Sequence, residues 1–177
     1  MVPAMLLVTA ALAAPSTGTP PVAAPAAVTA PFVAAPWSPR AARWGWPLKP
    51  EPPVVASFRA PPTPWSAGHR GVDLAAAVGQ PVLAAGGGRV TFAGSVAGRG
   101  VVVVTHPGGV RTSYEPVARR RAVGAAVVRG DRLGVVAPTR GHCAPRTCLH
   151  WGVRVGSRYV DPLDLVGRGP PVLLPWR

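Results

Sequence analysis

The sequence contains no asparagine and no isoleucine, and Lys49 is the only lysine among its 19 basic residues. Ala, Val, Gly, Pro and Arg dominate instead, which is typical of a GC-rich genome, so codon usage explains part of the arginine excess. Acidic residues are also scarce: six Asp and Glu leave a formal net charge of +13. Such a charge favours contact with polyanions such as nucleic acid, anionic lipid or a phosphate-bearing cell wall.

Several sequence patterns that define other classes of protein are missing. Neither a recognition-helix pattern nor an interleaved basic and aromatic motif is present, which argues against nucleic acid as the partner. No apolar run is long enough to span a bilayer. No amphipathic helix is recognisable either, which argues against a helical fold.

The N-terminal residues 1–14 form a short apolar run that ends in the small-x-small pattern Ala11-Leu12-Ala13. This pattern predicts a secretory signal peptide. No Lys or Arg precedes the run, so an incomplete gene start and an uncleaved anchor remain as alternatives. Export would place the protein outside the cytoplasm, secreted or associated with the cell wall.

Three further segments differ in composition. Residues 15–43 are mostly Pro, Ala, Thr and Val with almost no charge, which predicts an extended, disordered linker. Aromatic residues and strand patterns begin at Trp44, so we expect one domain over residues 44–166. Residues 167–177 form a Pro-rich tail.

The expected domain consists of short, Val-rich strands separated by glycines. The strand patterns cover residues 81–85, 88–93, 100–106, 110–114, 133–136 and 149–155. A Pro-Gly-Gly turn at residues 107–109 joins two of them into a hairpin. The sequence therefore predicts an all-β domain.

His69, Asp73 and His150 are the residues that point most directly to chemistry. Two imidazoles and one carboxylate are a three-ligand set that suits Zn²⁺ and leaves one position open for water. Gly68 and Gly71 argue against a helix here, so we expect a loop that leads into a strand and aims His69 and Asp73 at one point.

The motifs around these residues resemble the M23 peptidase domain, of the LytM and lysostaphin-like type. The resemblance lies in residues 68–90, with His-Arg-Gly-Val-Asp-Leu at its start, and in residues 101–106, 112–114, 127–134 and 149–155. It implies an antiparallel β domain with a zinc-floored groove that cuts peptide cross-links in peptidoglycan. By position, His69, Asp73 and His150 match the metal ligands of the family.

Two further histidines of the family assist the attacking water and the oxyanion, and both are replaced in this sequence. Pro116 stands two residues after the tyrosine of the Thr-x-Tyr segment, and Cys148 stands two residues before the last ligand. Neither a proline nor a disulfide-bonded cysteine transfers protons. The candidate substitutes are His142, Glu115 and Tyr114, although strand alternation turns Glu115 away and Tyr114 also suits wall packing.

Cys143 and Cys148 are the only two cysteines. A close pair in an exported protein favours a disulfide. The alternative is that Cys148 joins the three ligands in a closed structural zinc site. Near the site, Trp65, Tyr114 and Trp151 are candidates for lining a substrate groove, and the two tryptophans also suit a core.

The sequence thus predicts an exported, peptidoglycan-directed zinc metalloendopeptidase domain, with His142 or Glu115 in place of the missing histidines. The alternative is a non-catalytic module that binds peptidoglycan or activates a cell-wall amidase. The arginine run 119–121 is either a solvated loop or a contact to anionic wall polymers.

Overall fold

The computed structural model describes residues 44–63, 65–138 and 143–167. The signal peptide, the linker and the tail beyond Gly167 lie outside these residues, as does His142, so the predictions made for them stay predictions. Within the described residues, no helix is long and apolar enough to cross a membrane.

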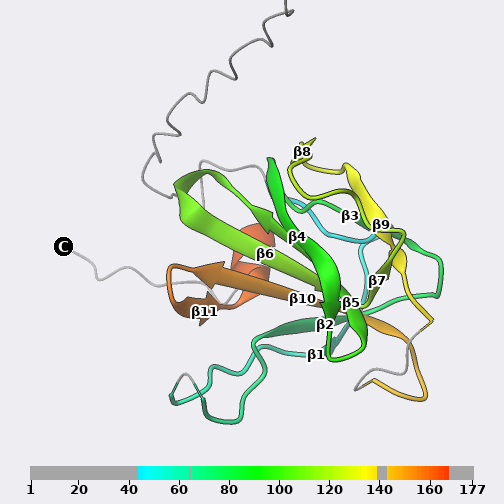
Figure 1. Ribbon diagram of the computed structural model, residues 1–177. Coiled ribbons are helices and arrows are strands. Elements are labelled where there is room, and N and C mark those ends of the chain that lie inside the picture. Colours follow the sequence, from blue (N-terminus) through cyan, green and yellow to red (C-terminus); the bar gives the residue numbers. More distant parts are fainter. Residues whose placement is uncertain (1–43, 64, 139–142, 168–177) are drawn as a thin grey trace, which may run out of the picture. The chain divides into compact units, whose positions relative to one another are not determined.

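The main sheet has eight strands and contains both segments that carry the expected metal ligands (Figure 1). Its order is β1-β2-β10-β6-β5-β4-β8, and β11 pairs with β10 at the side of this path. The strand bounds are β1 (Val54–Ala56), β2 (Gly71–Ala75), β4 (Gly88–Val96), β5 (Arg99–Thr105), β6 (Val110–Glu115), β8 (Ala126–Val127), β10 (Cys148–Val155) and β11 (Arg158–Val160). All of these pairings are antiparallel.

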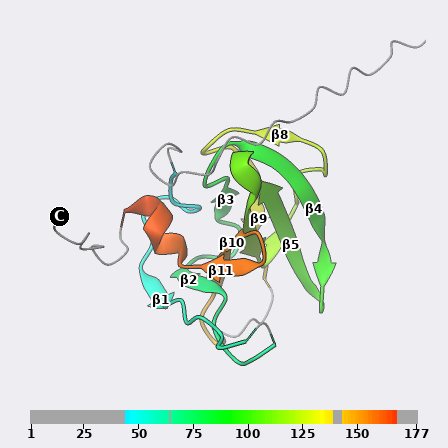
Figure 2. The ribbon, with the colours of Figure 1, turned by 90° about the vertical axis from the view of Figure 1, so that its left-hand side faces the viewer.

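A second sheet of three short strands has the order β3-β9-β7. Its strands are β3 (Pro81–Leu83), β9 (Arg132–Val136) and β7 (Val117–Ala118). In Figure 1 these strands lie together beside β4 and β5, and Figure 2 shows β3 and β9 side by side near the same two strands. Two 3-10 helices, η1 (Pro107–Gly109) and η2 (Pro162–Val166), complete the elements found in the described residues.

The core lies behind the face of the main sheet that carries Asp73 and His150. Strand alternation turns Val72, Tyr114 and Trp151 to this buried side, and all three side chains are fully buried. Because their strand neighbours point the other way, each central strand contributes one residue to the core and the next to the site. The all-β antiparallel fold is therefore confirmed.

Candidate metal centre

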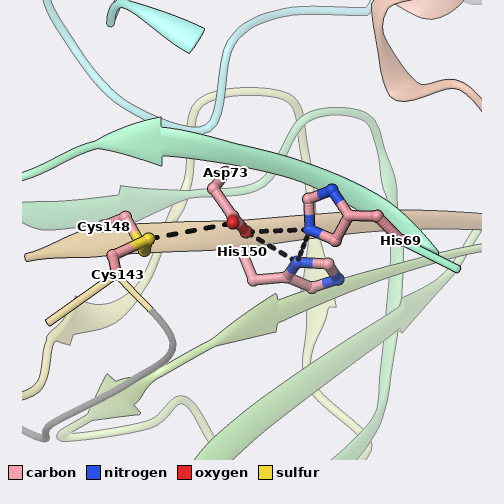
Figure 3. Close-up of a disulfide and its surroundings, with 5 residues drawn as sticks. All are labelled: His69, Asp73, Cys143, Cys148 and His150. Carbon is pink, nitrogen blue, oxygen red and sulfur yellow. Dashed lines mark hydrogen bonds and ion pairs between the residues drawn. A yellow bond between two sulfur atoms is a disulfide. The ribbon is translucent and has the colours of Figure 1, made fainter. Parts of the chain in front are cut away.

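The three expected ligands meet at one point of the main sheet (Figure 3). His69 Nε2 lies 3.2 Å from Asp73 Oδ1 and 3.1 Å from His150 Nδ1, and His150 Nδ1 lies 2.9 Å from Asp73 Oδ1. Asp73 and His150 are cross-strand partners on β2 and β10, so their side chains leave the same face. His69 joins them from just before β2, where an isolated bridge pairs it with Arg59.

The hydrogen-bonding pattern of this cluster fits a bound cation. His69 Nδ1 lies 2.7 Å from the Ser57 carbonyl oxygen, which can only accept, so Nδ1 donates. In the neutral ring, Nε2 then carries a lone pair and faces a carboxylate oxygen and a second imidazole nitrogen. Ligand atoms around a tetrahedral zinc lie about 3.3 Å apart, close to the three separations in the cluster. The donor set and its spacing therefore fit Zn²⁺.

One glycine makes room for the His150 ring and a second makes room for the neighbouring strand. Gly71 and Gly152 are cross-strand partners one step along the same face. A Cβ atom on Gly71 would lie 2.4 Å from the Trp151 carbonyl oxygen and 2.8 Å from both Cε1 and Nε2 of His150. One on Gly152 would lie 2.6 Å from Ser113 Oγ. Larger residues would therefore push the His150 ring, or the strands themselves, out of place.

A disulfide between Cys143 and Cys148 borders the centre on its other side (Figure 3). Cys143 Sγ lies 3.7 Å from Asp73 Oδ2, the second oxygen of the carboxylate. Asp73 is only 1% exposed. Because the two sulfur atoms are bonded to each other, Cys148 is not a thiolate ligand in this structure, and the closed four-ligand alternative is not formed.

Glu115 lies beside the centre, contrary to the expectation that it turns away. It is the cross-strand partner of His150 on β6, so Asp73, His150 and Glu115 form one row across three neighbouring strands. Directly opposed side chains point to the same face. The Glu115 carboxylate accepts a hydrogen bond from Arg99 Nε at 3.4 Å. Pro116, at the position of a missing histidine, is buried.

The three aromatic side chains expected in a groove separate into two environments. Tyr114 and Trp151 are fully buried in the core, so their placement in a substrate groove is wrong. Strand alternation explains the error. Tyr114 precedes Glu115 and Trp151 follows His150, and both of these neighbours face the site. Trp65 is 94% exposed, in the segment between β1 and β2.

Burial raises the pKa of Tyr114 to about 12, and its hydroxyl accepts from the Ala85 amide at 3.0 Å. It therefore has neither the position nor the acidity to replace a catalytic histidine.

A shallow cavity of about 520 Å³ adjoins the centre. Its lining contains two of the three ligands together with Phe58, Arg59 and neighbouring residues of the β1–β2 segment. The ligand atoms are therefore reachable from outside: the His69 and His150 side chains are 19% and 14% exposed.

A second polar cluster, built around the single histidine His106, lies in the core and was not expected from the sequence. His106 is 2% exposed, with Nδ1 lying 2.8 Å from the Gly87 carbonyl oxygen and Nε2 lying 2.7 Å from Thr112 Oγ1. Thr112 Oγ1 in turn lies 2.9 Å from the Tyr114 hydroxyl. Burial lowers the pKa of His106. Only the strand end before the turn at residues 107–109 hints at this role in the sequence.

The fold and the centre together agree with comparisons with known proteins. The family model of peptidase family M23 matches residues 67–162, more than half of the chain, and the chain therefore belongs to this family. It is also similar in structure to a zinc-containing peptidase from Vibrio cholerae, with a TM-score of 0.54 and 25% identity over 65% of this chain and 37% of that one.

Three relatives show how widely this domain is used. The uncharacterized protein Rv2891 of Mycobacterium tuberculosis is 50% identical over 75% of this chain and 55% of its own length. The DD-carboxypeptidase/endopeptidase Mpg of Neisseria meningitidis is 33% identical over 55% of this chain and 22% of its own. The lipoprotein NlpD/LppB homolog of Pseudomonas aeruginosa is 35% identical over 56% and 34%. The matched part thus spans about half the length of the mycobacterial relative and a smaller share of the other two.

Proposed function

We propose that the domain is a zinc metalloendopeptidase that acts outside the cytoplasm on the cross-link peptides of peptidoglycan. The observation that carries this proposal is the convergence of His69 Nε2, Asp73 Oδ1 and His150 Nδ1 within 3.2 Å of one another. Membership of the M23 family and the endopeptidase named among its relatives support it.

The three ligands would hold one Zn²⁺ ion, which when bound polarises a carbonyl group and lowers the pKa of a water molecule. The adjoining cavity gives an extended peptide access to this point. Glu115 supplies the proton acceptor, because it lies on the same face as His150 and one strand away. Arg99 orients its carboxylate through the 3.4 Å contact. His142 remains the other candidate for this role.

The missing histidines set the expected rate. Loss of general acid–base help lowers a rate by about 10²–10⁴. Loss of a donor to the oxyanion lowers it by roughly 10²–10³ more. Pro116 and the disulfide-bonded Cys148 can provide neither function, so turnover depends on how well Glu115 or His142 compensates.

The presence of Pro116 and Cys148 at the positions of the two family histidines favours a second candidate function. A domain that keeps the ligands and lacks both histidines would bind peptidoglycan, or activate a separate cell-wall amidase, without cutting peptides itself. The similarity to the NlpD/LppB homolog supports this second candidate. In either case the net charge of +13 supports attraction to anionic wall polymers.

Release of soluble peptides from purified peptidoglycan by the zinc-loaded protein tests the proposal. We expect release that is lost in His150→Ala and falls at least about tenfold in Glu115→Gln, which keeps the size of the side chain and removes its charge. Ser95→Ala, on the exposed part of β4, is the matched control and should behave as the wild type.

The absence of release, combined with pelleting of the protein with the wall, would reject the endopeptidase and support the binding module. Stimulation of a purified amidase in the same preparation would identify that module as an activator. Release that is equal in the wild type and His150→Ala would show that the activity does not come from this centre.

A further inference from the structure

A second pocket, of about 700 Å³, lies at the other end of β10 from the disulfide. It is formed by the segment between β1 and β2, by Arg70, and by the β10–β11 hairpin. Arg154 lies four residues beyond His150 on β10, which corresponds to about 13 Å of extended strand. The pocket is thus separate from the metal centre but within reach of the same polymeric ligand.

The lining of this pocket is strongly basic. It contains Arg70, Arg154 and Arg158, and none of the residues lining it is Asp or Glu. Arg158 is exposed, and no ion pair within the described ranges involves Arg154 or Arg158. The guanidinium groups of Arg154 and Arg158, without a carboxylate in the lining, favour an anionic ligand.

Arg154 also has an unused hydrogen-bond donor. Its Nε atom is buried and has no partner within the part of the chain that the structure describes. A buried donor without an acceptor is unfavourable, so a ligand oxygen that the guanidinium group turns to meet would stabilise it. This observation is independent of the net charge and points to a ligand that carries oxygen atoms.

Aromatic rings give the pocket a second kind of surface. The guanidinium carbons of Arg70 and Arg154 lie 5.9 Å and 5.7 Å from the centre of the Tyr159 ring. Cation–π contacts of this kind use the faces of the guanidinium groups rather than the N–H donors at their edges. Arg70 Nη2 also donates to the Ser66 carbonyl oxygen at 3.0 Å. Trp65, at 94% exposure, offers an uncovered ring to the apolar face of a sugar.

We propose that this pocket binds a phosphate-bearing saccharide, as carried by an anionic wall polymer. Phosphate is favoured over a single carboxylate because several guanidinium groups share the pocket and phosphate can accept from more than one at once. Trp65 contributes the saccharide selectivity. The inference rests on the proposed function only for the source of the ligand, since this binding needs neither zinc nor hydrolysis.

Calorimetric titration of the full chain with glucose 1-phosphate, glucuronic acid and inorganic phosphate tests the pocket. We expect glucose 1-phosphate to bind about tenfold more tightly than the other two, and its affinity to fall about tenfold in Arg158→Ala. Trp65→Ala should weaken the binding of glucose 1-phosphate and leave the binding of inorganic phosphate unchanged. Arg154→Lys keeps the charge but not the planar guanidinium group, and its affinity for glucose 1-phosphate should lie between those of the wild type and Arg158→Ala.

Two control variants separate binding in this pocket from binding elsewhere on the protein. Arg121→Ala removes the same charge from the run at residues 119–121 and should leave binding unchanged. His150→Ala should also bind glucose 1-phosphate as the wild type does, so failure of the metal centre and failure of the pocket give different results.

Three outcomes would overturn the proposal. The first is an equal affinity of the wild type and Arg158→Ala for glucose 1-phosphate. The second is inorganic phosphate binding as tightly as glucose 1-phosphate, which would leave an anion site without a saccharide. The third is a single-stranded oligothymidine that binds more tightly through the same arginines, which would assign the pocket to nucleic acid.

Discussion

The two histidine-containing clusters of this domain differ in how hydrogen atoms are distributed among their polar groups. In the buried cluster, the Gly87 carbonyl fixes the hydrogen of His106 on Nδ1, so Nε2 accepts from Thr112. Thr112 then accepts from Tyr114, and Tyr114 accepts from an amide. Every donor meets an acceptor, and the chain runs in one direction.

The candidate metal centre is arranged differently. Its three facing atoms are two imidazole nitrogens and one carboxylate oxygen, and in the neutral ring the His69 nitrogen among them presents a lone pair. A histidine in a complete chain of hydrogen bonds stabilises the fold. A histidine whose lone pair meets other lone pairs indicates a site for a cation. The residue type alone does not distinguish the two cases.

Removal of one ligand should give the largest effect. His150→Ala is expected to weaken zinc binding by more than about 100-fold, because even loss of a group that only supports a ligand costs about 10–100-fold. Competition with a chromogenic chelator measures this affinity. Thr112→Val, in the buried cluster, is the control and should bind zinc as the wild type does. Equal affinities for wild type and His150→Ala would place the metal elsewhere.

The same control variant should be the one that loses stability. Thr112→Val leaves His106 Nε2 and the Tyr114 hydroxyl without their shared partner, which lowers the free energy of unfolding by about 1–3 kcal/mol. Urea denaturation of the zinc-free protein measures the change. Ser95→Ala, at an exposed hydroxyl, should change it by less than about 0.5 kcal/mol. A Thr112→Val protein as stable as the wild type would show that this chain of hydrogen bonds does not stabilise the fold.

Crowding of the His150 ring should give a smaller loss of zinc affinity. Gly71→Ala places a methyl group 2.4 Å from the Trp151 carbonyl oxygen and 2.8 Å from the His150 ring, and we expect roughly tenfold weaker zinc binding as the strand and the ring move. Gly87→Ala is the matched control, because the nearest atom to its Cβ would be at 3.6 Å. Unchanged affinity in Gly71→Ala would mean that His150 does not need this glycine.

The pH dependence of stability should distinguish the buried histidine. Because burial lowers the pKa of His106 in the folded protein, the unfolded chain binds the proton first. The stability contributed by neutral, buried His106 is therefore fully present above its unfolded pKa of about 6.5. It is lost as the pH falls towards the lower pKa of the folded protein. We expect a slope of at most about 1.4 kcal/mol per pH unit. Denaturation of the wild type and His106→Gln from pH 5 to 8 measures it, and parallel curves would contradict it.

The sequence predicted the strands that carry Val-rich patterns, including the three-residue β3, and missed four others that carry none. Six Val-rich segments correspond to strands, whereas β1, β7, β8 and β11 have only two or three residues and show no period. β2 was expected only as a strand entered from a loop, because Gly71 reads as a turn residue. Pairing with β10 explains why a glycine is needed inside this strand.

The clustering of His69, Asp73 and His150 was predictable from the sequence, whereas the surroundings of the cluster were not. Residue types and family motifs identify His69, Asp73 and His150, because the donor atoms themselves define the chemistry. Cross-strand register decides the rest, and a single sequence does not contain it. Register brings Glu115 next to His150, and strand alternation places Trp151 in the core.

The row Asp73, His150 and Glu115 has a consequence for how this enzyme family could be engineered. Backbone hydrogen bonds fix the spacing between neighbouring strands at about 4.8 Å, so the three residues of the row keep fixed distances from one another. Loops around the row can be lengthened or exchanged without changing the spacing between these strands. A one-residue deletion inside β10, in contrast, would exchange the inner and outer faces at once and remove the site and the core together.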